Sequence, residues 1–197
     1  YLISESTFGL PIFKWDEPEK TTADILKWVD TSPDKTSILF CYSLGKAQRL
    51  LNEISKSNFQ KHIYTHSSIY KINNCYKKLG INILNTTKFD KTQNIDELKG
   101  SLLLLPPALN KSSYLKKFKY IQTGFASGWM LIRALRKRSG YDKGFAISDH
   151  ADWEGILKTI KESEAKNIFF HHGDSEALSR YYREKNSINV LCFDSKK

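Results

Sequence analysis

Apolar residues recur along the chain in two alternating patterns, short runs of about four or five residues and longer stretches with a helical period. Short runs predict strands at residues 1–4, 37–41, 62–65, 101–105, 120–123, 144–148, 167–170 and 188–193. Helical periods predict helices at residues 45–55, 67–79, 127–138, 152–163 and 174–184. Strands that alternate with helices build a largely parallel sheet. The sequence therefore predicts an α/β fold.

Two histidines follow predicted strands in the last third of the chain. His150 comes just after residues 144–148, and His172 comes just after residues 167–170. Ligands of a parallel sheet bind at the carboxyl ends of its strands, so we expect both histidines at the ends of neighbouring strands. Imidazole is a good zinc ligand and titrates near neutral pH. His171 is expected to be only a neighbour of the working residue, because adjacent strand side chains face opposite ways.

Two Gly- and Ser-containing segments follow other predicted strands and open helices. One holds Ser43, Gly45 and Lys46, and the other holds Ser127 and Gly128. Free backbone N–H groups and the helix dipole at such positions favour a phosphate, and Lys46 would add positive charge. The alternative is a turn that glycine permits and serine caps. The first segment is far from a complete nucleotide-binding loop motif.

The predicted helix 127–138 ends in a basic cluster in which Arg133 and Arg136 share one face at i, i+3 spacing. Cations at a helix C-terminus stabilise the helix by themselves. Beside a loop that could hold phosphate, we favour the interpretation that these arginines track a nucleic-acid backbone.

Composition sharpens this picture. The chain has 31 Lys and Arg against 21 Asp and Glu, a net charge of +10, which favours a polyanionic partner over the alternative of merely solvated lysines. No apolar run approaches ~18 residues, so no membrane span or membrane partner is expected. Cys41, Cys75 and Cys192 lie in or beside apolar runs without a metal-binding spacing, which indicates reduced, buried thiols and a cytoplasmic protein.

Three stretches together resemble the β-CASP branch of the metallo-β-lactamase superfamily. They are Glu5-Ser-Thr-Phe-Gly9, Ser148-Asp-His-Ala-Asp-Trp153 and His172-Gly173, in this order and spacing. The stretches Tyr42-Ser-Leu-Gly-Lys-Ala-Gln-Arg-Leu-Leu51 and Ser127-Gly-Trp-Met130 look most like bacterial ligase-associated DNA exonucleases, often labelled mRNA 3′-end processing factors. The resemblance covers nearly the whole chain.

This resemblance implies a domain organisation and roles for single residues. Residues 20–140 would form a β-CASP insertion domain with a parallel sheet. Residues 1–19 and 141–197 would belong to the C-terminal part of a metallo-β-lactamase αββα sandwich. His172 would be a zinc ligand. His150 would contact the scissile phosphate, and the Glu5 carboxylate would pair with His150. A histidine held by a carboxylate keeps one tautomer and can assist the leaving oxygen.

The implied activity is a metal-dependent nuclease, an exonuclease acting on DNA or RNA in repair or RNA processing, with two zinc ions or alternatively manganese. The same resemblance implies a functional association with a DNA ligase. The superfamily's His-x-His-x-Asp-His motif is absent from these residues, so we expect the chain alone to lack a dinuclear site, to be inactive and to leave apolar surface around residues 144–193 uncovered. The chain also begins within a predicted strand without Met, which suggests a fragment.

Two other functions compete with this one. A β-CASP module that has lost its metal ligands would bind nucleic acid without cleaving it, and a His-x-His-x-Asp-His motif upstream would exclude that reading. A hydrolase of small esters would need neither the basic helix nor the large inserted segment.

Overall fold

A computed structural model describes residues 1–90, 92–110, 112–113, 115–185 and 188–191. The chain divides into two compact units. The small unit contains residues 1–15 and 150–197, and the large unit contains residues 16–149. The sequence suggested boundaries near residues 19 and 140, and the second differs because the strand after residue 141 pairs within the large unit.

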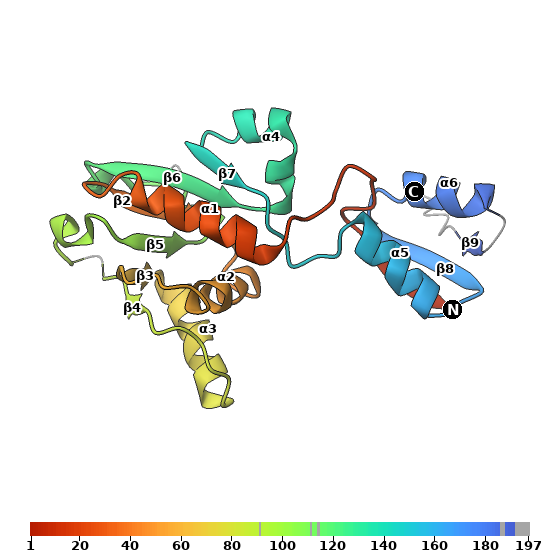
Figure 1. Cartoon of the computed structure of the whole chain (residues 1–197), viewed down its shortest axis with the longest axis horizontal. Coiled ribbons are helices and arrows are strands. Elements are labelled where there is room, and N and C mark those ends of the chain that lie inside the picture. Colours follow the sequence, from red (N-terminus) through yellow and green to blue (C-terminus); the bar gives the residue numbers. More distant parts are fainter. Residues whose placement is uncertain (91, 111, 114, 186–187, 192–197) are drawn as a thin grey trace. The chain divides into compact units, whose positions relative to one another are not determined.

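The large unit is built on a six-stranded parallel sheet of order β4-β3-β5-β2-β6-β7 (Figure 1). Its strands are β2 (Thr36–Phe40), β3 (Ile63–Thr65), β4 (Thr87–Lys88), β5 (Leu102–Leu105), β6 (Ile121–Ala126) and β7 (Lys143–Phe145). Its α-helices are α1 (Pro18–Asp30), α2 (Lys46–Ser55), α3 (Ser67–Lys78) and α4 (Arg133–Arg138). Short 3₁₀ helices are η1 (Ile95–Leu98), η2 (Pro107–Leu109), η3 (Leu115–Lys117) and η4 (Gly128–Leu131).

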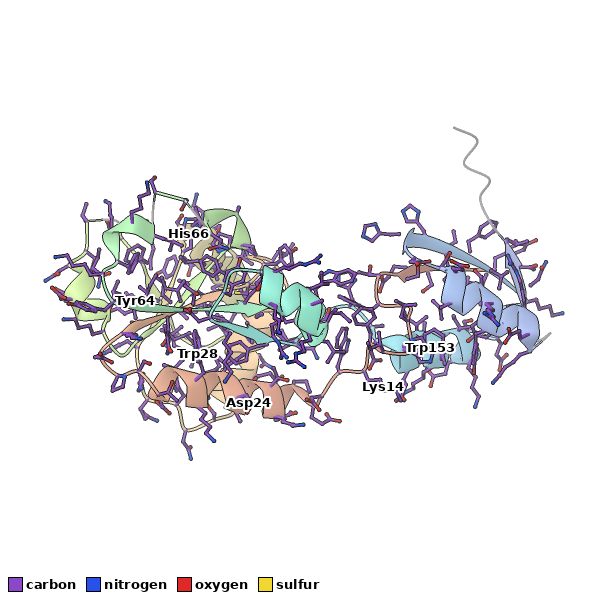
Figure 2. The ribbon with its side chains drawn as sticks, turned by 90° about the horizontal axis from the view of Figure 1, so that it is seen from above. Lys14, Asp24, Trp28, Tyr64, His66 and Trp153 are labelled. Carbon is purple, nitrogen blue, oxygen red and sulfur yellow. The ribbon has the colours of Figure 1, made fainter. Side chains whose placement is uncertain are left out.

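Both faces of this sheet are buried, which explains its uninterrupted apolar runs. Every residue of β2 and of β5 is buried. Helices α1, α2 and α3 cover one face, where Trp28 (labelled in Figure 2) packs edge-to-face on Phe145 with ring centroids 5.4 Å apart. The opposite face packs against η1 and the residues around Phe118.

The small unit has a three-stranded parallel sheet of order β1-β8-β9. It contains β1 (Leu2–Ser6), β8 (Asn167–Gly173), β9 (Asn189–Leu191), α5 (Trp153–Glu162) and α6 (Glu176–Glu184). Apolar residues of α5 and α6 pack on Ile168 to form its core. The N-terminal and C-terminal segments of the chain meet here, since the Trp153 N–H donates to the Phe13 carbonyl at 3.1 Å.

Among the residues that the structure describes, little covers one face of this small sheet. Ile3 is 70% exposed, and its neighbours in register, Phe169 and Leu191, are half-buried. Apolar surface of this kind is unusual on a stable monomer and marks a surface that another element covers.

The parallel α/β class predicted from the sequence is confirmed, but three local predictions are wrong. The strand before His150 ends at Phe145 and pairs in the large sheet, whereas β8 lies in the small one, so the two histidines do not end neighbouring strands. Residues 123–126 continue β6 instead of forming a loop. The predicted helix 127–138 is interrupted at Ile132, which has extended φ and ψ of −78° and 110°.

Cys41 is buried as expected, whereas Cys75 is exposed on α3, and Cys192 lies outside the described residues. Among the helices that the structure describes, none combines the length and the apolar character needed to cross a membrane.

Candidate active site

Glu5 and His150 come together in the small unit, although 145 positions separate them in the sequence. The distance between Glu5 Oε1 and His150 Nδ1 is 3.5 Å, and both side chains are partly exposed. The other Glu5 oxygen, Oε2, accepts a hydrogen bond of 2.7 Å from the Thr7 N–H, which fixes the carboxylate. A carboxylate beside Nδ1 favours a proton on that nitrogen and leaves Nε2 for a substrate.

Three further contacts hold His150 in this place. The Trp15 indole N–H donates to the His150 carbonyl at 3.0 Å. Phe8, which is buried, presents its ring edge-to-face to the imidazole at 5.8 Å between centroids. Asp152 accepts from the backbone N–H of Trp15 at 3.0 Å and from that of Gly155 at 2.8 Å. Asp152 is thus the N-cap of α5 and also joins this helix to the N-terminal segment through Trp15.

His172 occupies a backbone irregularity on the strand next to β1. Glu5 is in register with His171, and Ser6 is in register with Gly173, so His172 is the extra residue of a β-bulge. Its φ is 63°, and its carbonyl accepts a 3.0 Å hydrogen bond from Ser6 Oγ. Bulges beside functional sites re-aim a side chain, and a left-handed non-glycine residue is held only by its surroundings.

Gly173 makes this bulge possible. Its φ is +97°, and a Cβ at this position would lie 2.5 Å from the Ser6 carbonyl carbon. Simple strand alternation predicts opposite directions for His171 and His172, but both are exposed because the bulge breaks the alternation. No local signal in the sequence other than the glycine itself indicates the bulge.

The metal ligands in this region are few. Within the described ranges, no three His, Cys, Asp or Glu side chains gather closely enough to hold a metal ion. His172 is therefore a single candidate ligand, and the donors of these residues do not by themselves fit a zinc site, which needs three or more.

The loop of Ser43, Gly45 and Lys46 is occupied by contacts within the large unit. Ser43 Oγ lies 2.9 Å from Ser68 Oγ, and the Gly45 N–H donates to Gln48 Oε1 at 2.8 Å. The positive charge that Lys46 was expected to add is neutralised within the large unit. Its side chain is 3% exposed, and Nζ lies 2.8 Å from Asp149 Oδ1, because burial of an ammonium requires a counter-charge.

The second loop is also less accessible than the sequence suggested. Ser127 and Gly128 are buried, and the Ser127 N–H donates to the Phe145 carbonyl. Arg133 and Arg136 remain exposed, but Arg133 begins α4 instead of lying near the end of a long helix. A cation at the N-terminal end of a helix gains no stabilisation from the helix dipole.

Arg49, near this loop, was not among the residues predicted from the sequence. Arg49 of α2 donates through Nη1 to the Ser148 carbonyl, so α2 binds both Ser148 and Asp149 just before His150. Gly45 has φ +80°, and a Cβ there would lie 2.8 Å from Asp149 Oδ2. His66, another polar residue of this edge, caps α3 by accepting from the Ser68 N–H at 3.2 Å.

Charge is divided unequally between the units. Residues 16–149 contain 22 Lys and Arg against 12 Asp and Glu, whereas the remaining residues contain 9 of each. The whole net charge of +10 therefore belongs to the large unit. A polyanion would be attracted to that unit and not to the one that holds Glu5 and His150.

Comparisons with known proteins bear on the fold and on the biological context. No family model matches the chain. The chain is 26% identical over 186 residues to a "Probable DNA ligase" of Opitutus terrae (strain DSM 11246 / JCM 15787 / PB90-1), covering 93% of the chain. A solved structure described as a protein of unknown function from Enterococcus faecalis V583 aligns with TM-score 0.52 and 12% identity over 96% of the chain.

The chain spans 18% of the length of the first relative and 48% of the second. At these identities the structural likeness supports the α/β fold alone.

Proposed function

We propose that this chain is the part of a metal-dependent nuclease that supplies the residues acting on the scissile phosphate and the surface that binds the polymer. The observation that carries the proposal is the 3.5 Å approach of Glu5 Oε1 to His150 Nδ1. The three stretches that resemble β-CASP nucleases include both residues, and the third stretch provides His172 at a bulge beside β1. In this interpretation the large unit is the β-CASP domain and the small unit is part of a metallo-β-lactamase sandwich.

The open face of the small sheet supports this interpretation. A sandwich requires a second sheet against the first, and Ile3, Phe169 and Leu191 offer an apolar face for one. Such a cover would also bring further side chains toward Glu5, which lies two residues from Ile3 and so projects on the same side of β1.

Zinc, or manganese in its place, would supply Lewis-acid activation of a water molecule. Because the described residues do not complete a metal site, the steps assigned to this chain are confined to Glu5, His150 and the residues that hold them. Glu5 keeps the His150 imidazole oriented with Nδ1 toward the carboxylate. In the imidazolium form, in which both ring nitrogens carry a proton, the Nε2–H group donates to a phosphate oxygen or gives its proton to the leaving oxygen.

The substrate is proposed to be nucleic acid because the large unit carries the whole net positive charge of the chain. DNA is favoured over RNA by the name of the relative, a probable DNA ligase. That name also supports an association of this activity with strand joining. A second candidate function is a non-catalytic nucleic-acid-binding module, which is favoured by the incomplete set of metal ligands.

The test uses the full-length gene product with end-labelled single- and double-stranded DNA and RNA, in zinc and in manganese. His150→Ala should reduce cleavage by about two orders of magnitude or more with little change in bound zinc, because this residue acts on phosphate. Glu5→Gln should also reduce cleavage, while nucleic-acid binding is retained. His172→Ala should lose zinc as well as activity.

His171→Ala is the matched control, since it removes an exposed imidazole from the adjacent position of the same strand. Equal zinc content in the His172 and His171 variants would contradict the ligand role of His172. A full-length protein that binds nucleic acid but cleaves none of the substrates would favour the non-catalytic module.

A further inference from the structure

A cavity of about 340 Å³ opens in the large unit at the amino-terminal edge of its sheet. It lies beside Thr36, the first residue of β2, and Tyr120, the residue before β6. The groups that give it chemical character are Lys99, Lys117, Lys119, Tyr120, Gln93 and Asn94. Ser43, Lys46 and the other loop residues predicted from the sequence follow the opposite ends of strands, so this cavity is a separate place in the unit.

The cavity has an excess of positive charge. Three lysines line it against one carboxylate, Asp96, whose Oδ1 lies 2.9 Å from Lys99 Nζ. The hydrogen bond from Lys99 lowers the pKa of Asp96, and the charge of Lys119 adds to that effect. Asp96 therefore stays ionised and neutralises Lys99. Lys117 and Lys119, both exposed, supply the remaining positive charge.

The segment of sequence that carries Lys117 and Lys119 also lacks acidic residues. Between Glu97 and Asp142 the sequence has nine Lys and Arg and no Asp or Glu. This stretch includes Lys117 and Lys119, so within it no carboxylate offsets their charge. Such a local field attracts a polyanion.

Tyr120 gives the cavity an exposed aromatic surface. Its side chain is 60% exposed, although its backbone is fixed by the Thr36 N–H, which donates to the Tyr120 carbonyl at 3.0 Å. Lys99 Nζ lies 5.9 Å from the centroid of the ring. Exposed aromatic rings beside lysines are the elements with which proteins bind single-stranded nucleic acid, because the ring stacks on a base while the ammonium groups bind phosphates.

We propose that this cavity binds a nucleotide of a single-stranded nucleic acid, with Tyr120 stacked on the base and Lys117 and Lys119 on the flanking phosphates. The amide side chains of Gln93 and Asn94 offer donors and acceptors to the base edge. The proposal rests on the nucleic-acid-binding part of the proposed function and needs no metal or cleavage. A strand bound here would extend the contact of the large unit beyond Arg133 and Arg136.

The experiment measures binding of the chain to a short fluorescent oligothymidylate by anisotropy across a series of salt concentrations. Lys117→Ala combined with Lys119→Ala should weaken binding about tenfold at low salt, and the slope of log affinity against log salt should fall by about 1.4. The matched control is Lys71→Ala combined with Lys78→Ala, two exposed lysines of α3 that do not line the cavity. It should change affinity less than about twofold.

The tyrosine is tested with two substitutions and two ligands. Tyr120→Leu should weaken binding of oligothymidylate about fivefold or more, and Tyr120→Phe should retain it, because stacking needs only the ring. On an abasic backbone of the same length, all three proteins should bind alike. An acidic peptide, the other class of polyanion, should not respond to Tyr120→Leu.

Equal losses in the cavity pair and the α3 pair would overturn the proposal, and so would a Tyr120→Leu loss that is the same on the abasic backbone. A wild-type chain that bound no oligonucleotide would remove the nucleic-acid part of both proposals. Failure of zinc binding or cleavage in the full-length protein would contradict the proposed nuclease but not the proposed nucleotide site.

Discussion

Under the proposed function, the two units of this chain divide recognition and chemistry between them. The large unit is a closed structure with both sheet faces covered and the whole net charge of +10. The small unit is electrically balanced, has one open sheet face, and holds Glu5, His150 and His172. The residues that resemble a catalytic centre therefore lie outside the unit whose net charge would attract a polyanion.

Two glycines with positive φ, one in each unit, differ in what surrounds them. In the small unit, the left-handed His172 and the close contact of Gly173 with Ser6 form part of the candidate site. In the large unit, Gly80 has a similar φ of +76° but lies in open space at the end of α3. Packing requires the glycine at position 173, whereas at position 80 only the backbone conformation of the turn favours one.

The largest effect is expected from a pair of substitutions that tests this contrast. Gly173→Ala should destabilise the small unit by about 3 kcal/mol or more, because the new Cβ would overlap the Ser6 backbone. Gly80→Ala should cost about 1 kcal/mol, from positive φ alone. Hydrogen exchange of the β1 and β8 amides measures the loss in the small unit. Equal protection in both variants would show that the bulge is not tightly packed.

An effect of comparable size is expected from pH, and it should act on the large unit. Burial raises the pKa of the Cys41 thiol to about 12 from an ordinary value of 9.0. The folded state therefore holds this proton more tightly, so the stabilisation is present below pH 9 and is lost as pH rises from about 9 to 12. The loss from this group should be about 1.4 kcal/mol per pH unit within that window.

Urea unfolding between pH 8 and pH 11 measures this loss. Cys41→Ala should reduce the slope of stability against pH by that amount, because it removes the titrating group. Cys75→Ala, at an exposed position of the same unit, is the control and should leave the slope unchanged. A Cys41→Ala protein with the wild-type slope would assign the loss to other groups.

The smallest effect compares two pairs of cations with the same helical spacing. Arg133→Ala with Arg136→Ala on α4 should weaken binding of single-stranded DNA about threefold to tenfold and reduce its salt dependence. Lys158→Ala with Lys161→Ala on α5 removes the same charge from the balanced small unit and should have less than a twofold effect. Anisotropy titrations at several salt concentrations distinguish the two. Similar losses in both would show that charge location does not matter.

Much of the fold follows from the sequence because burial on both sides leaves a direct record in it. The run Leu102–Leu105 is apolar at every position since β5 is covered on both faces, and Ile156 and Ile160 recur with the helical period of α5. Asp152 also marks the start of α5 by its chemistry. Such signals are local, so they can be read without knowing what the element packs against.

The partners of each strand and the environment of each charge were decided only by the tertiary structure. Residues 143–145 and 167–173 look alike as strands, yet one pairs in the large sheet and the other in the small sheet. Lys46 looks like a free cation until Asp149 is found beside it, about a hundred residues later. The approach of Glu5 to His150 and the bulge at His172 depend on strand pairing between the two ends of the chain. Hydrophobic period fixes the elements because it is local, whereas these contacts join distant residues and form only when the units pack.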